Sequence, residues 1–242
     1  MQADLLTFAA NHVYGTSVLT CLTAQNPNDI SAIAPTQSEH VAAQADAISS
    51  YFTITAAKTG MLLNREIIEV AVAFFSRNPK IKLVVDPVVT ASSGKCLLED
   101  SAIYALKTQL LPLSEIITPN LDEAEILYGE KLKTPERMKS AAVEMAKKWN
   151  TAVLIKGGHM KGDLLHDILS EANGNVHSFT QNRIHSIDTH GSGCTLSAAI
   201  ASQLAKGSPI VIAVSTARAY LRRAMESPIR LQGKRFINHF PQ

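Results

Sequence analysis

The sequence predicts an α/β fold in which a mostly parallel β-sheet is covered by helices. Short runs of β-branched and aliphatic residues alternate along the chain with segments whose apolar residues recur at helical spacing. The 242 residues fit one large α/β domain, and no repeat, low-complexity tract or linker interrupts them. We therefore expect a single domain over residues 1–242.

Strands are expected where the apolar runs are short and bounded by polar or glycine residues. They are residues 18–23, 54–58, 82–86, 114–118 and 152–156, with a hairpin of residues 166–170 and 176–180 around Asn173-Gly174. A loop rich in proline and asparagine is expected after the first strand, through Pro35. The run at 82–86 is almost wholly Leu and Val, which is typical of a strand buried on both faces.

Helices are marked by capping residues and apolar stripes. Ser38 and Asn64 are candidate N-caps, and Thr134-Pro135 begins a helix with proline in its first position. Further helices are expected at residues 100–111, 120–127 and 210–225, and directly after the glycines at 191 and 193.

Composition excludes several classes of protein. The formal net charge of +2 argues against a dedicated nucleic-acid surface, and we interpret Arg218, Arg222 and Arg223 as a solvated helix face. The three cysteines show no metal-ligand spacing, and an odd number of cysteines without a pairing pattern is typical of a reducing compartment. No apolar run is long enough to span a bilayer, and the N-terminus lacks a signal pattern, so we expect a soluble cytoplasmic protein without membrane contacts.

Polar and glycine residues gather directly after four of the expected strands. These groups are Lys58-Thr59-Gly60, Asp86-Pro87, Thr118-Pro119-Asn120 and Lys156-Gly157-Gly158. In open α/β sheets, ligands bind outside the carboxyl ends of the strands. The sequence therefore predicts a common cleft at this edge.

Two acidic positions at that edge allow a structural and a functional interpretation. Asp86 can hold Mg²⁺ or place a phosphoryl group, or it can be satisfied by nearby backbone amides. Asn120 and Glu123 have the spacing of a capping box, and the same side chains can hold metal-bound water.

The remaining candidates are equally open when each is taken alone. Lys156 can reach a phosphate over its neighbouring glycines or can be solvated. Gln25, Met61 and Val88 follow three different strands and can line a small aromatic pocket or contribute to packing.

The most informative stretch runs from Asp188 to Ser197. Gly191 and Gly193 flank Ser192 and lead into a helical pattern, and unpaired N–H groups and the helix dipole at such a start attract anions. Cys194 lies in the first turn, where the same field favours the thiolate. Taken alone, the stretch fits either a phosphate site or a glycine turn packed against a small buried thiol.

The order of these motifs resembles the hydroxymethylpyrimidine/phosphomethylpyrimidine kinases of thiamine biosynthesis, in the ribokinase-like superfamily. The resemblance covers essentially the whole chain and rests on Thr23-Ala24-Gln25-Asn26, Lys58-Thr59-Gly60-Met61, Asp86-Pro87-Val88, Thr118-Pro119-Asn120-Leu121-Asp122-Glu123, Lys156-Gly157-Gly158-His159 and Thr189-His190-Gly191-Ser192-Gly193-Cys194-Thr195-Leu196-Ser197-Ala198. It implies a three-layer α/β/α sandwich, an ATP- and Mg²⁺-dependent kinase, an aminopyrimidine alcohol as substrate and a homodimer.

The resemblance also implies roles for individual residues. Gly191, Ser192, Gly193 and Cys194 would bind the transferring phosphoryl group, with Cys194 as the base for the substrate hydroxymethyl group if its pKa is lowered at the helix start. Asp86 and Glu123 would organise Mg²⁺, and Lys156, Asn120 and Thr189 would contact ATP. Gln25 would hydrogen-bond the aminopyrimidine edge while Met61 and Val88 pack against its faces.

One feature departs from the family pattern. Members usually begin with a strand and a Gly-x-Asp-x-Ser-Gly-Gly-Ala-Gly loop before the segment that here starts at Met1, and the sequence does not contain them. We expect a version extended upstream of Met1 to exceed this chain in thermal stability and in kinase activity.

Three other functions stay open. A pyridoxal kinase of the same cysteine-containing subgroup would share the fold, the ATP site and Cys194. A non-catalytic protein could keep the pyrimidine or nucleotide site without transferring phosphate. A Cys–His hydrolase could use Cys194 with His190 or His159, but then Asp86, Asn120, Glu123 and Lys156 would have no shared purpose.

Overall fold

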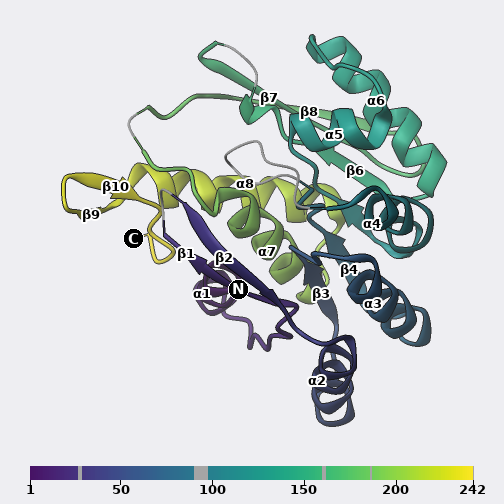
Figure 1. The fold of residues 1–242 in the computed structure, drawn as a ribbon. Helices are drawn as coiled ribbons and strands as arrows, with labels where there is room; N and C mark the ends of the chain where they lie inside the picture. The colour runs from purple at the N-terminus through teal and green to yellow at the C-terminus, as the bar shows by residue number, and fades with distance from the viewer. Residues whose placement is uncertain (27–28, 90–97, 160–161, 186, 242) are drawn as a thin grey trace.

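A six-stranded sheet with strand order β3-β4-β5-β6-β7-β8 forms the centre of the molecule (Figure 1). The computed structural model describes residues 1–26, 29–89, 98–159, 162–185 and 187–241. The strands are β3 (Ala56–Thr59), β4 (Lys82–Val85), β5 (Ile116–Ile117), β6 (Ala152–Ile155), β7 (Leu164–Ser170) and β8 (Val176–Asn182). The pairs from β3 to β6 are parallel, whereas β7 and β8 form the predicted antiparallel hairpin.

Helices cover both faces of this sheet, which confirms the predicted three-layer α/β/α arrangement (Figure 1). One layer contains α2 (Ser38–Tyr51), α3 (Arg65–Arg77), α4 (Asp100–Ala105), α5 (Leu121–Tyr128) and α6 (Pro135–Trp149). The other contains α1 (Gln2–Ala10), α7 (Ser192–Ala205) and α8 (Ile210–Glu226). Within the described ranges, no helix combines the length and apolar character needed to cross a membrane.

The central strands bury both of their faces, as their Leu- and Val-rich sequences predict. Val84 and Leu154 pack into the core beneath α7 and α8. Their sequence neighbours Val85 and Ile155 point the other way, into the core that includes α3 and α6. This alternation fixes which side chains reach each helical layer.

The parallel strands end at the same edge of the sheet, and their backbones continue to bond beyond the strands. The N–H of Asp86 donates to Thr59 O at 3.0 Å, and the N–H of Thr118 donates to Val85 O at 2.9 Å. The N–H of Lys156 then donates to Pro119 O at 2.9 Å. The residues that follow β3, β4, β5 and β6 are thereby brought into one row.

Two small hairpins lie outside the main sheet. β1 (Cys21–Gln25) pairs with β2 (Ile30–Pro35), and β9 (Ile229–Leu231) pairs with β10 (Lys234–Phe236). The prediction of a loop through Pro35 is wrong for β2, and the strand expected at residues 18–23 begins later. Both strands of the first hairpin are largely exposed, so they lack the apolar alternation that marks a half-buried strand.

Side-chain caps begin three of the helices, α3, α5 and α6. Asn64 caps α3, its side chain accepting from the N–H of Ile67 at 3.0 Å, and Thr134 caps α6. Ser38 is instead the first residue of α2, whose N-cap is Gln37 without a side-chain bond, so that prediction is wrong.

The helix expected at residues 100–111 is divided. α4 ends at Ala105, and the chain continues through a wider π-helical segment, Leu106–Leu110, and a 3₁₀ turn, Leu111–Leu113. Pro112 in that turn cannot donate a backbone hydrogen bond, which ends the helix there.

Replacement of Leu154 by alanine tests the buried strand. Leu154 is fully buried in β6, so Leu154→Ala should lower the free energy of unfolding by about 3 kcal/mol through lost transfer energy and a residual cavity. Leu231→Ala is the control, because Leu231 is 60% exposed and its replacement should change stability by less than about 0.5 kcal/mol. Chemical denaturation measures both, and equal losses would contradict the assignment of β6 to the core.

Candidate functional site

A cavity of about 1960 Å³ opens at the carboxyl ends of the parallel strands, where the sequence predicts a common cleft. Eleven of the predicted site residues line it, namely Gln25, Met61, Val88, Asn120, Glu123, Lys156, Thr189, Gly191, Ser192, Gly193 and Cys194. They come from the first hairpin, from the ends of four sheet strands and from the start of α7. Side chains far apart in sequence therefore share one solvent-accessible space.

The glycine-rich stretch forms the start of α7 and the turn before it. Gly191 is the N-cap residue and has a φ of +82°, a left-handed conformation that favours glycine. It supplies no side-chain acceptor, so the positive end of α7 stays available to an anion. A Cβ built on Gly193 would lie 3.3 Å from Lys156 Nζ, which shows how closely the turn approaches that ammonium group.

Lys156 and Asp86 form an ion pair beneath this turn. Lys156 Nζ donates to Asp86 Oδ1 at 3.0 Å, and their side chains are only 14% and 4% exposed. Ser197 Oγ on α7 also donates to the carboxylate, at 3.4 Å. The predicted metal ligand Asp86 thus lies below the cavity wall, under Lys156, instead of lining the cavity.

Both members of this pair are charged at neutral pH. Burial pushes the pKa of Asp86 upward, but the positive charges of Lys156 and Lys58 outweigh it, and the pKa lies below its ordinary value. Burial likewise lowers the pKa of Lys156, but the carboxylates of Asp86 and Glu123 outweigh it, and the pKa lies above its ordinary value. The site therefore holds a compensated pair of buried charges.

Asn120 and Glu123 form the predicted capping box at the start of α5. Asn120 Oδ1 accepts from the N–H of Glu123 at 2.9 Å, and Glu123 Oε2 accepts from the N–H of Asn120 at 2.8 Å. Burial raises the pKa of Glu123 to about 7, and the Asp86 carboxylate acts in the same direction. Glu123 therefore takes part in the cap of α5, and its carboxyl group changes charge near neutral pH.

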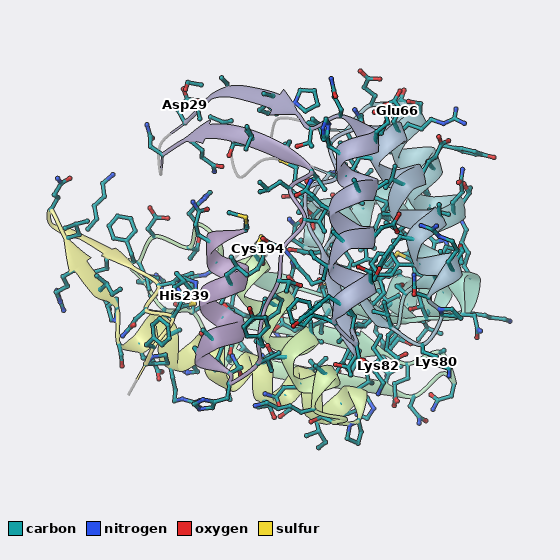
Figure 2. The ribbon with its side chains drawn as sticks, turned by 90° about the horizontal axis from the view of Figure 1, so that it is seen from below. Asp29, Glu66, Lys80, Lys82, Cys194 and His239 are labelled. Atoms are coloured by element: carbon teal, nitrogen blue, oxygen red, sulfur yellow. The ribbon has the colours of Figure 1, made fainter. Side chains whose placement is uncertain are left out.

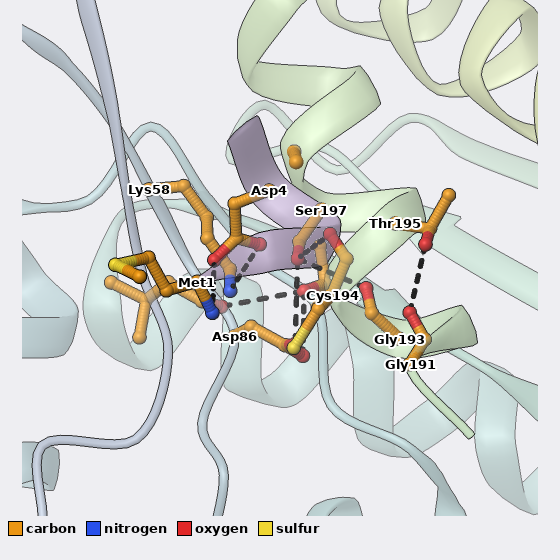
Figure 3. A network of polar contacts seen from close by, with 12 residues as sticks. Met1, Asp4, Lys58, Asp86, Gly191, Gly193, Cys194, Thr195 and Ser197 are labelled. Atoms are coloured by element: carbon orange, nitrogen blue, oxygen red, sulfur yellow. Dashed lines mark hydrogen bonds and ion pairs between the residues drawn. The ribbon is translucent and has the colours of Figure 1, made fainter. Parts of the chain in front are cut away.

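Cys194 lies in the first turn of α7, beside α1 (Figures 2 and 3). Burial raises the pKa of its thiol, and the nearby Lys58 charge opposes that rise. The expectation that the helix start lowers this pKa is therefore wrong for the unliganded protein. Desolvation of the thiolate outweighs the favourable field at this position.

Lys58 and Asp4 form a second ion pair that the sequence reasoning missed. Lys58 Nζ donates to Asp4 Oδ1 at 3.0 Å, and the Lys58 side chain is only 4% exposed (Figure 3). The charges of Cys194, Asp4 and Asp86 together outweigh burial and raise the pKa of Lys58. The position of Lys58 at a strand end was visible in the sequence, but nothing there indicated its partner in α1.

The described side chains give the hydrolase interpretation no histidine in contact with the Cys194 thiol. The imidazole of His190 contacts Gln25, with 3.1 Å between His190 Nε2 and Gln25 Nε2, and no contact with Cys194 is seen among the described residues. The side chain of His159 lies outside the part of the chain that the structure describes. The described geometry thus gives no support to a Cys–His pair.

Asp86 and Glu123 are the acidic residues at this edge that could hold Mg²⁺. Among the residues that the structure describes, no three His, Cys, Asp or Glu side chains gather as a metal-binding group. Mg²⁺ is commonly held by one or two carboxylates together with water and substrate phosphates. Asp86 and Glu123, which interact electrostatically, match that donor set.

The family model described as phosphomethylpyrimidine kinase matches residues 1–238. The chain belongs to the phosphomethylpyrimidine kinase family. A hydroxymethylpyrimidine/phosphomethylpyrimidine kinase of Rhizobium meliloti is 43% identical over 99% of this chain and 91% of that protein. Membership makes this protein a phosphotransferase of a kinase family, which uses ATP.

Two solved structures show the same ribokinase-like fold. The phosphomethylpyrimidine kinase of Clostridium difficile is 37% identical, with a TM-score of 0.81 over 92% of this chain and 91% of that one. An ADP complex of Bacillus subtilis pyridoxal kinase is 32% identical, with a TM-score of 0.89 over 100% of this chain and 92% of that one. The same fold therefore occurs in kinases that are named for two different substrates.

Alanine substitutions in the turn after Lys156 test how closely the backbone packs at this edge of the sheet. A Cβ on Gly157 would lie 1.9 Å from His166 O, whereas one on Gly158 would meet no atom within 4 Å. Gly157→Ala should therefore lower the free energy of unfolding by about 2–3 kcal/mol through a backbone clash. Gly158→Ala is the matched control and should change it by less than about 1 kcal/mol. Denaturant titration of both variants measures this, and similar values for the two would refute the close packing.

Proposed function

We propose that this protein transfers the γ-phosphoryl group of ATP to 4-amino-5-hydroxymethyl-2-methylpyrimidine and then to its monophosphate, in thiamine diphosphate biosynthesis. Family membership supports the reaction class, and the names of curated relatives support the substrates. The observation that carries the proposal is the meeting of three features in one cavity. They are the glycine-rich start of α7, Cys194 and the ammonium group of Lys156, which pairs with Asp86 beneath the cavity wall.

Gln25, Met61 and Val88 would form the pyrimidine pocket. All three line the cavity, and they come from different segments of the chain. The Gln25 amide can both donate to and accept from an aminopyrimidine edge, while Met61 and Val88 offer apolar contacts to its faces. In the structure, His190 contacts that amide at 3.1 Å.

The phosphate groups of ATP would lie between the start of α7 and Lys156. The Gly191–Cys194 turn offers backbone N–H groups and the positive end of a helix, and Lys156 adds an ammonium group. Thr189 and Asn120 border the same space. Phosphoryl transfer needs chiefly positioning and charge neutralisation, which such groups supply without rearrangement.

Asp86 and Glu123 would hold Mg²⁺, which neutralises phosphate charge when it is bound. Asp86 stays ionised next to Lys156, and Glu123 changes charge near pH 7, so both can become anionic donors. Neither residue would supply a complete site without phosphate oxygens and water.

Cys194 would be the base that accepts the proton of the substrate hydroxymethyl group. The raised pKa leaves the Cys194 thiol mainly protonated in the unliganded protein. The positive charge of Lys58 opposes that rise and would favour the thiolate. A base works best when its pKa lies near the working pH.

Substitution of Cys194 tests this role. Cys194→Ala should lower kcat by about 10²–10⁴-fold, because the proton acceptor is lost, while ATP binding measured by calorimetry changes little. Cys194→Asp should keep more activity than Cys194→Ala, since a carboxylate can accept the proton. Unchanged turnover in Cys194→Ala would remove the assignment, and ligand binding without any ADP formation in the parent protein would favour a binding protein.

A pyridoxal kinase is the second candidate, favoured by the close likeness to the Bacillus subtilis pyridoxal kinase. We expect the pyrimidine to win when both substrates compete at equal concentration with ATP and Mg²⁺, because Gln25 can pair with an amino-bearing ring edge. The two phosphorylated products, separated by chromatography, measure the preference. A predominance of pyridoxal phosphate would reverse it.

We also propose that the protein works as a homodimer in the cytoplasm. Leu22 and Ile33 in the β1–β2 hairpin are 60% and 37% exposed, and such apolar side chains are suited to an interface with a second copy.

A further inference from the structure

A third buried ion pair lies behind the turn that carries Lys156. Arg218 Nε, from α8, donates to Asp167 Oδ2, from β7, at 2.8 Å, and the two side chains are 12% and 10% exposed. The interpretation of Arg218 as part of a solvated helix face is therefore wrong. Its guanidinium lies over the Phe179 ring, 4.8 Å from the centroid, which removes it from water.

The other oxygen of the Asp167 carboxylate binds the turn that follows Lys156. Asp167 Oδ1 accepts from the N–H of Gly157 at 2.9 Å. Asp167 thus connects α8 to the residue that directly follows Lys156. Because Arg218 and Gly157 use different oxygens, the carboxylate cannot rotate without losing one of the two bonds.

The turn is fixed from several sides at once. The N–H of Lys156 donates to Pro119 O at 2.9 Å, and Arg183 Nη1 donates to Gly158 O at 2.9 Å. On the β7 side, Gly157 fits so closely against His166 that no side chain can be added. Asp167 therefore supplies the bond that fixes the peptide between Lys156 and Gly157.

Stability alone gives a weak reason for this arrangement. Arg218 Nη2 is buried and has no hydrogen-bond partner among the described residues. A buried ion pair with an unsatisfied donor is often no more stable than well-packed apolar side chains. What the pair provides instead is a fixed place for the Asp167 carboxylate, because Arg218 Nε and the Gly157 N–H bind different oxygens of it.

We propose that Asp167 and Arg218 are positioning residues that set the place of the Lys156 ammonium group over the ATP phosphates. The inference rests on the proposed role of Lys156. Asp167 and Arg218 act only through the Gly157 peptide. Their loss should weaken the ATP interaction and leave the pyrimidine pocket intact, because Gln25, Met61 and Val88 lie on other elements.

The decisive variants are Arg218→Met and the double variant Asp167→Leu/Arg218→Met, in which residue 167 can no longer accept from the Gly157 N–H. Arg218→Met should raise the KM for ATP about tenfold, with the KM for the pyrimidine within about twofold, because a displaced ammonium group loses contact with phosphate. It should also lower the melting temperature, since Asp167 loses its charged partner. The double variant removes both charges and the acceptor of the Gly157 N–H, so it should regain part of that stability while the KM for ATP stays raised.

Two control variants separate positioning from general damage. Arg222→Met removes an arginine on the same helix whose Nη1 donates to Asn182 O at 3.1 Å. Glu171→Gln alters a carboxylate at the far end of the same hairpin, paired with His177 at 2.9 Å. Neither should change the KM for ATP by more than about twofold, since neither contacts the Gly157 turn.

The outcomes distinguish this inference from the function on which it rests. If Lys156→Met weakens ATP binding in calorimetry but Arg218→Met does not change the KM for ATP, the positioning role is overturned and the proposed role of Lys156 stands. If Lys156→Met leaves ATP binding unchanged, that role itself fails. A double variant whose KM for ATP returns to the parent value together with its melting temperature would show that the pair is merely structural.

Discussion

The buried pair of Asp86 and Lys156 is the interaction on which the site depends. It joins the end of β4 to the end of β6 across β5, with a separation of 3.0 Å between Nζ and Oδ1. Removal of either partner would leave a buried charge uncompensated, at about 3–5 kcal/mol. The parallel register makes the pair possible, because it brings both strand ends to the same level.

Two further pairs extend this arrangement on either side. Lys58 pairs with Asp4 next to Cys194, and Arg218 pairs with Asp167 behind the Lys156 turn. Each cation is matched by a carboxylate, so the charges survive burial at the edge of an otherwise apolar sheet. Glu123 differs from these paired carboxylates, because its pKa of about 7 lets its carboxyl group gain or lose a proton near neutral pH.

Much of the sheet and of the cavity lining could be predicted from the sequence, and the reason is local. Leu- and Val-rich runs mark buried strands, and the carboxyl ends of parallel strands meet at one edge, so Asn120 and Lys156 could be placed there without coordinates. The exposed strand β2 has no apolar alternation, and the helix α1 was not recognised. The roles given to the individual site residues stay predictions.

The ion-pair and charge partners that come from distant segments of the chain could not be predicted from the sequence. Arg218 shares helical spacing with Arg222, yet one is buried against Asp167 and the other is more exposed. Spacing within one helix cannot tell which arginine faces a carboxylate that lies 51 residues away in the chain. The pKa of Cys194 depends in the same way on burial and on Lys58, neither of which its local motif contains.

Under the proposed roles, the central pair also couples nucleotide to metal. If Lys156 Nζ moved away from Asp86 toward a phosphate, a carboxylate that is only 3% exposed would lose a partner. A carboxylate so buried needs a replacement cation, because desolvation strongly disfavours an unpaired charge. Asp86 and Glu123 would hold a divalent cation, which would supply the positive charge that Asp86 then needs. Under these roles, the burial of the pair would favour joint binding of nucleotide and cation.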